Sequence, residues 1–171
     1  MKMDMKEQYK LIIAKYAAKQ LNTDDLLNFA DRKLNEGETS DHLIELLYYK
    51  KREWNEIYPC FESAISEIGE GIPTPDEAIW MILRYHINII ANQESNPFKQ
   101  FKLLLNDIKW FPYYEKTTKY VGDAIGIHYL YGLYYSPDDL GKENFDENIK
   151  IIETKMIQES KKWLAVYMKE H

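Results

Sequence analysis

Residues 74–90 read TPDEAIWMILRYHINII. A threonine followed three residues later by a glutamate forms a capping box, and Pro75 stands at the first helical position. The run behind this cap is apolar on most faces and is interrupted by Arg84, His86 and Asn88. The pattern predicts a central helix that is buried on two sides.

Four further helices are expected before this one, over residues 6–21, from Thr23 to Gly37, from Ser40 to Leu47 and over residues 53–68. Each has apolar residues at a helical spacing. Asn22 or Thr23 caps the second helix, Gly37 ends it in the left-handed conformation, and Ser40 caps the third. Pro59 lies inside the fourth pattern and is expected to kink or split that helix.

On the carboxyl side, Asn96-Pro97 opens a sixth helix that reaches residue 108. Periodicity weakens over residues 109–143, where we expect loops around a short helix over residues 123–135, distorted by Gly126 and Gly132. Ser136-Pro137-Asp138-Asp139 caps a brief turn that Gly141 ends. A long final helix is predicted over residues 145–169, with an apolar stripe that begins at Phe145.

These patterns predict one all-α domain over residues 1–171, with helical hairpins at 6–108, an aromatic irregular segment at 109–143 and a long C-terminal helix at 144–169. The two segments from Thr23 to Leu47 and from Thr74 to Leu105 each read as two capped helices. An irregular multi-helix bundle and HEAT-like stacked helical hairpins both fit this arrangement.

The chain carries 28 acidic and 22 basic residues, for a net charge of −6. An acidic balance argues against nucleic acid as a ligand and favours a basic protein partner. The charged N-terminal stretch has no signal-peptide pattern, no run approaches a membrane span, and a lone cysteine fits a reducing compartment. We therefore expect a cytoplasmic protein that does not bind membranes.

No motif for catalysis, a cofactor or a metal stands out. Cys60 follows a proline on an apolar face, which favours a small buried side chain over a nucleophile. His42 and Glu45 share a helix face, but the sequence has no second such pair to complete a metal site, so solvated surface is favoured. The glycines of the middle segment match no phosphate-binding fingerprint. We expect a protein without a cofactor, and favour a non-enzyme.

An alternative function uses a pocket beside the fifth helix. Arg84, Tyr85 and His86 lie on that helix, and His128 lies in the aromatic segment. A small-molecule site or an enzyme would place these four side chains around one solvent-connected cleft. A further alternative is a helical scaffold without a single site.

The aromatic segment holds the strongest functional signal. Nine of the 26 residues from Trp110 to Tyr135 are aromatic. Tyrosine is enriched at protein interfaces because it combines a large contact area with a polar group. The same rings are also suited to a second small core over the helix ends. For the interface we expect these residues to bind a partner: Tyr113, Tyr114, Asp123, Tyr131, Tyr135, Asp138 and Asp139.

A string of residues in and around this segment carries a family resemblance. It comprises Gly122-Asp123, Gly126, Leu130, Gly132, Tyr134-Tyr135 and Asp138-Asp139-Leu140, together with the stretch from Leu43 to Trp54 and Lys162-Trp163-Leu164. The chain resembles uncharacterised all-α bacterial families that occur as immunity proteins beside polymorphic toxins. The resemblance implies binding of a toxin, such as a basic toxin domain, and no enzyme activity.

Overall fold

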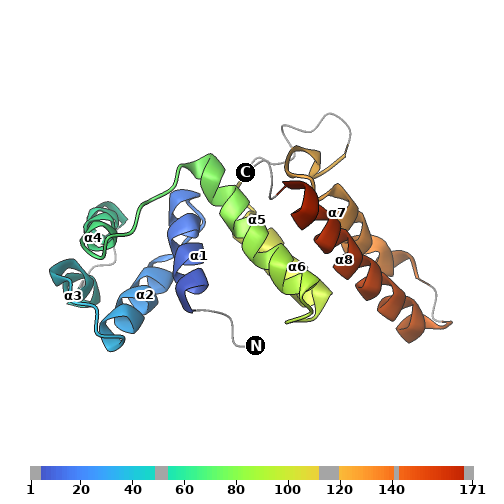
Figure 1. Ribbon diagram of the computed structural model, residues 1–171, viewed down its shortest axis with the longest axis horizontal. Helices are drawn as coiled ribbons and strands as arrows, with labels where there is room; N and C mark the ends of the chain where they lie inside the picture. Colours follow the sequence, from blue (N-terminus) through green and yellow to red (C-terminus); the bar gives the residue numbers. More distant parts are fainter. Residues whose placement is uncertain (1–4, 49–53, 112–119, 141–142, 168–171) are drawn as a thin grey trace. The chain divides into compact units, whose positions relative to one another are not determined.

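The computed structural model of the chain describes residues 5–48, 54–111, 120–140 and 143–167 (Figure 1). These residues form eight α-helices and two short 3-10 helices, without a strand among them, which confirms the predicted all-α fold. The chain divides into an N-terminal unit, residues 2–78, and a C-terminal unit, residues 79–171. No helix in the described ranges is both long and apolar enough to cross a membrane.

The N-terminal unit consists of four helices. They are α1 (Met5–Ala17), α2 (Thr23–Asn35), α3 (Asp41–Tyr48) and α4 (Trp54–Glu67). Helix α2 packs against α1, α3 and α4, and α3 also packs against α4. Neighbours in sequence are thus neighbours in space, as short connections favour.

Interlocked aromatic rings form the centre of this unit. Phe29 and Phe61 are fully buried, with ring centroids 5.4 Å apart. Tyr9 meets Phe29 edge-on at 5.4 Å, and Tyr16 lies 4.9 Å from Phe61. Both tyrosine hydroxyls donate to surface glutamates, so burial of the rings leaves no unpaired hydroxyl.

The predicted ends of α2 and the predicted cap of α3 are confirmed, whereas α1 ends at Ala17, four residues before the predicted end at residue 21. Asn22 forms a reciprocal capping box at the start of α2, and Gly37 follows this helix with a φ of +92°. The Ser40 hydroxyl accepts a hydrogen bond from the backbone N–H of Leu43 at 3.0 Å. Helix α4 runs unbroken through Pro59, so of the two expected effects, a kink or a split, the split does not occur.

The C-terminal unit begins in the first turn of α5. Its elements are α5 (Pro75–Ala91), α6 (Pro97–Asp107), η1 (Asp123–Ile125), α7 (His128–Tyr135), η2 (Ser136–Asp139) and α8 (Phe145–Tyr167). The predicted capping box at Thr74 and the cap at Asn96 are both confirmed. Helix α8 packs against α6 and α7, and Figure 1 shows α7 and α8 running antiparallel.

The segment predicted as one distorted helix over residues 123–135 is two elements. Gly126 ends η1 with a φ of +71°, a left-handed conformation that stops the helix before α7 begins. Gly132, the second predicted point of distortion, lies within α7 without interrupting it. Two glycines in one segment thus have different backbone roles.

The predicted stripe of α8 is confirmed at its centre and is wrong at its first residue. Ile152, Met156 and Trp163 are buried, at a spacing of four and seven residues. Phe145 is 42% exposed because it occupies the first position of the helix, almost two turns before the first buried residue.

Candidate functional site

The tyrosines of residues 120–140 divide into an inner and an outer set. Tyr134 packs inward, against two phenylalanine rings of α6. Tyr120, Tyr129 and Tyr135 are exposed, with Tyr129 the most open at 67%. The two sequence-based interpretations, core and interface, therefore each describe part of the same segment.

Four of the predicted partner-binding residues lie at the carboxyl end of this segment. Tyr135 ends α7 and is exposed, while Tyr131 is half-buried with its ring 4.8 Å from the Tyr135 ring. Asp138 and Asp139 are exposed in η2, directly after α7. The structure thus places these two tyrosines and two aspartates on one continuous piece of chain.

Asp123 has a different environment from the other predicted acidic residues. One carboxylate oxygen accepts a hydrogen bond from the backbone N–H of Tyr120 at 2.9 Å. The other lies 2.9 Å from His128 Nδ1, without the alignment of a hydrogen bond. Asp123 therefore orders the turn before α7. Tyr113 and Tyr114 lie outside the described residues.

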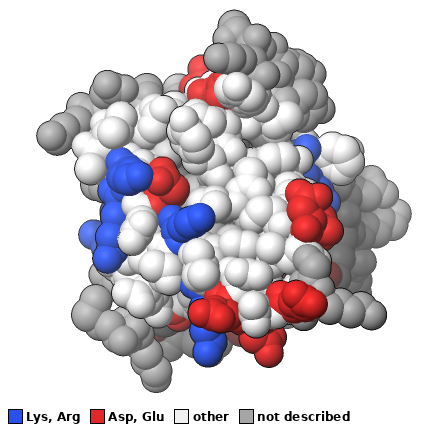
Figure 2. Space-filling model, turned by 90° about the vertical axis from the view of Figure 1, so that its right-hand side faces the viewer, with Lys and Arg blue, Asp and Glu red and all other residues white. Residues whose placement is uncertain are grey.

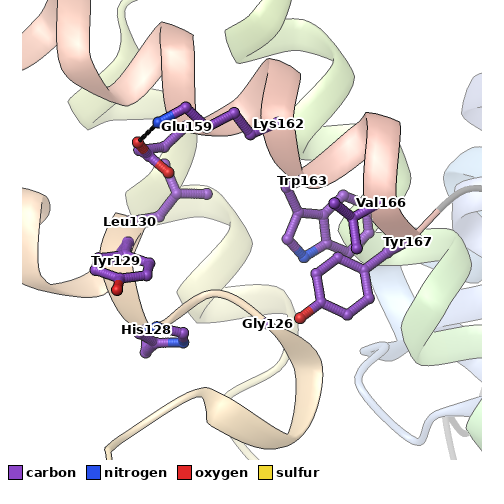
Figure 3. Close-up of a pocket in the computed structure, with 9 residues that line it drawn as sticks. All are labelled: Gly126, His128, Tyr129, Leu130, Glu159, Lys162, Trp163, Val166 and Tyr167. Atoms are coloured by element: carbon purple, nitrogen blue, oxygen red, sulfur yellow. Dashed lines mark hydrogen bonds and ion pairs between the residues drawn. The ribbon is translucent and has the colours of Figure 1, made fainter.

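A pocket of about 190 Å³ opens between the start of α7 and the end of α8 (Figure 3). The residues that line it are Gly126, His128, Tyr129, Leu130, Glu159, Lys162, Trp163, Val166 and Tyr167. The Trp163 indole N–H donates to the Ile125 carbonyl at 3.0 Å, which ties α8 to η1. At Gly126 a Cβ atom would lie 2.3 Å from the Tyr167 ring, so the glycine lets the ring pack on the backbone.

The residues that α8 contributes to this site are not among the predicted site residues. The sequence pattern predicts Trp163 as a core residue, and it is indeed 95% buried, yet it also lines the pocket. Glu159, Trp163 and Tyr167 recur every four residues and so share one helix face. This four-residue spacing indicates a shared helix face, but a buried stripe and a pocket wall produce the same spacing, so it does not identify a pocket.

The charge of the α7 region is one-sided. Residues 120–140 contain Asp123, Asp138 and Asp139 but no lysine or arginine. Figure 2 shows the side of the C-terminal unit that carries α7 and α8, where both basic and acidic side chains surround a broad uncharged area. An uncharged centre with a charged rim is typical of protein interfaces.

The residues of the alternative pocket do not line this cavity together. His86 is 3% exposed, and its Nε2 lies 3.0 Å from Asp107 Oδ2 and its Nδ1 2.7 Å from Gln100 Nε2. His86 therefore lies in a buried polar network between α5 and α6. Tyr85 packs edge-on against His86, whereas His128 lines the pocket beside α8.

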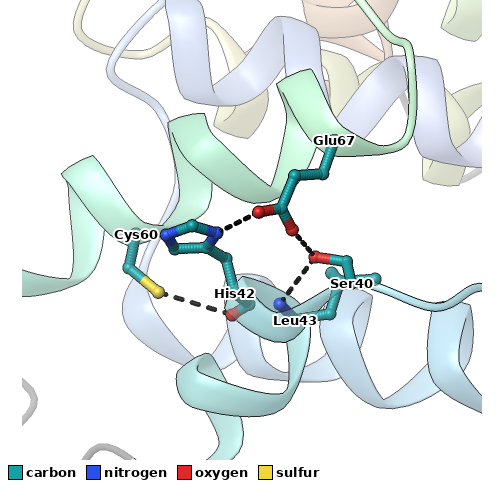
Figure 4. Close-up of polar contacts among 5 residues, drawn as sticks. All are labelled: Ser40, His42, Leu43, Cys60 and Glu67. Atoms are coloured by element: carbon teal, nitrogen blue, oxygen red, sulfur yellow. Dashed lines mark hydrogen bonds and ion pairs between the residues drawn. The ribbon is translucent and has the colours of Figure 1, made fainter.

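In the N-terminal unit a polar cluster joins α3 to α4 (Figure 4). The Glu67 carboxylate accepts from the Ser40 hydroxyl and contacts His42 Nδ1, each at 2.5 Å. The hydrogen bond from Ser40, followed by that from His42, lowers the pKa of Glu67. The carboxylate lies between serine and histidine, so the histidine does not serve as a base for the serine.

Cys60, beside this cluster, is suited to packing rather than to nucleophilic chemistry. Its side chain is 6% exposed, and its Sγ lies 3.4 Å from the carbonyl oxygen of His42. Burial, followed by the negative charge of Glu45, raises the pKa of the thiol to about 11. At neutral pH the group is a thiol and not the reactive thiolate.

Comparisons of the chain with known protein families, with curated proteins and with solved structures found no match.

Proposed function

We propose that this chain is a non-catalytic binding protein of the immunity type, which inhibits a basic toxin domain by covering it. The observation that carries the proposal is the composition and exposure of residues 120–140. This segment combines three exposed tyrosines with three aspartates and has no lysine or arginine. Exposed rings supply contact area, and a one-sided negative charge favours a cationic partner.

The contacts around the segment support this function. Tyr134 packs α7 against α6, α7 also packs against α8, and the Trp163 indole ties α8 to η1. The exposed rings therefore lie on packed helices. A rigid base lowers the entropy lost on binding. The net charge of −6 adds a long-range attraction toward a basic partner.

The test is co-expression of the chain with the product of the adjacent reading frame, which the proposal requires to be a toxin domain. We expect the two proteins to co-purify and the chain to restore growth. The triple variant Tyr135→Ala, Asp138→Asn, Asp139→Asn should weaken binding at least about a hundredfold, because one aromatic anchor and two complementary charges are lost.

The matched control is Tyr48→Ala, which removes an exposed tyrosine of the N-terminal unit. It should leave binding unchanged. If the triple variant binds like the unmodified chain, the segment is not the interface. If Tyr135→Ala by itself unfolds the protein, the segment serves as core, and this mapping is wrong.

A further inference from the structure

The pocket between α7 and α8 has aromatic walls on two sides. Tyr129 of α7 stands on one side, and Trp163 and Tyr167 of α8 stand on the other (Figure 3). The Trp163 and Tyr167 rings stack with centroids 5.3 Å apart and an interplanar angle of 28°. Ring faces bearing partial negative charge attract cations and planar guanidinium groups.

A carboxylate completes the lining. Glu159 lies one helical turn before Trp163 on the same face of α8, and its side chain is 26% exposed. Its Oε1 contacts the Nζ of Lys162 at 2.5 Å. Lys162 is 69% exposed and lies three residues away on the same helix. An exposed pair of this kind contributes little stability, so an incoming cation displaces the lysine at small cost.

We propose that this pocket receives one arginine side chain of the basic partner, with the guanidinium on the Tyr129 and Tyr167 rings and against Glu159. The inference rests on the proposed function, since that function supplies the basic partner. Charge complementarity selects the occupant. The Glu159 carboxylate lies in the lining, and Asp123 contacts His128 of the lining. Lys162, the basic residue of the lining, is paired with Glu159.

Arginine fits this lining better than other side chains do. Its planar guanidinium group can bind a carboxylate with two parallel hydrogen bonds while it stacks on aromatic rings. A lysine ammonium group cannot make both interactions at once. An apolar side chain would use the rings and leave Glu159 bound to Lys162. An acidic side chain would meet the Glu159 carboxylate and would be repelled by it.

The test adds N-acetyl-arginine methylamide, as the probe, to the full chain. The NMR signal of the Trp163 indole N–H reports its binding. The probe should shift this signal saturably, with a dissociation constant on the order of millimolar, as suits a single side chain. N-acetyl-norleucine methylamide should bind much more weakly. Equal binding of the two compounds would overturn the proposal, because the pocket would then recognise only apolar contact.

Two matched variants break the same ion pair and should act in opposite directions. Glu159→Gln should weaken arginine binding about tenfold, because a charge-assisted pair is lost. Lys162→Gln should tighten arginine binding about threefold, because the cation that competes for Glu159 is gone. Glu147→Gln, at an exposed position in the first turn of α8, should change nothing. Weaker binding by Lys162→Gln would show an anion site and overturn the proposal.

The same variants separate this inference from the proposed function. If the toxin co-purifies but the probe does not shift Trp163, the pocket proposal fails and the binding function stands. If the probe binds as expected and no toxin co-purifies, the arginine pocket stands and the immunity function fails.

Discussion

At the residue scale, one glycine links the pocket to the fold. Gly126 has a φ of +71°, and a Cβ there would lie 2.3–2.5 Å from two ring carbons and the hydroxyl oxygen of Tyr167. We expect Gly126→Ala to lower the free energy of unfolding by about 2 kcal/mol or more, through left-handed strain and overpacking. Urea denaturation measures this change.

The control for that prediction is a second glycine in the neighbouring helix. Gly132 lies within α7, and a Cβ added there meets no atom within 4 Å. Gly132→Ala should therefore raise stability, by about 0.5–1 kcal/mol, because alanine favours the helix. If the two variants have the same stability, Gly126 is not required for the packing of Tyr167.

A second residue-scale prediction concerns acid stability. The pKa of Glu67 is lowered in the folded chain, by hydrogen bonds from Ser40 and then His42. A carboxyl whose pKa is depressed on folding contributes stability above its unfolded pKa and loses that contribution as the pH falls through its folded pKa. The unmodified chain should therefore lose more stability than Glu67→Gln between about pH 6 and pH 3.

Denaturant unfolding at a series of pH values tests this effect. Glu70→Gln, which removes a nearby carboxylate outside the contacts of Ser40 and His42, serves as the control and should follow the unmodified chain. Parallel pH curves for the unmodified chain and Glu67→Gln would show that the cluster does not favour the ionised carboxylate.

At the element scale, a buried polar network joins α5 to α6. His86 and Gln100 are 3% and 5% exposed, and His86 also contacts Asp107 at the end of α6. We expect His86→Leu to destabilise the chain by about 1–3 kcal/mol for each partner left without a hydrogen bond. A double-mutant cycle in urea with Gln100→Leu should give a smaller loss than the sum of the single variants.

This cycle also bears on the alternative function. A strictly additive cycle would contradict the network. If His86 acts only in the network, co-purification with a partner should survive His86→Leu whenever the variant remains folded. Loss of partner binding by a folded His86→Leu variant would instead support a functional site beside α5.

At the scale of the whole molecule, the excess of acidic residues sets how the chain meets a partner. Opposite net charges accelerate association and are screened by salt. For a basic toxin domain the association rate should fall by about tenfold or more between 20 and 500 mM salt, while the dissociation rate changes little. Stopped-flow measurements provide both rates.

The local source of that attraction is also testable. Asp138→Asn with Asp139→Asn should flatten the salt dependence, because these exposed carboxylates lie in the proposed interface. Asp146 is exposed at the start of α8, and Asp146→Asn should reduce the salt dependence of the association rate less. An association rate that is independent of salt would mean that charge does not guide the encounter.

The sequence by itself determined the helices and most of their ends. The caps at Asn22, Ser40, Thr74 and Asn96 depend on residues within three positions, so the local sequence predicts them. The break in pattern after residue 108 likewise marked the region of α7. These features follow from short-range hydrogen bonds and from the spacing of apolar residues.

Only the tertiary structure decided which side chains meet. The pocket joins α7 to a face of α8 more than 25 residues later, and the His86 network joins two helices across their connection. A buried stripe and a pocket wall have the same periodicity, so the pattern around Trp163 predicts only a core residue. Whether a ring such as Tyr129 or Tyr134 faces outward depends on the helix that packs beside it, and this pairing is non-local.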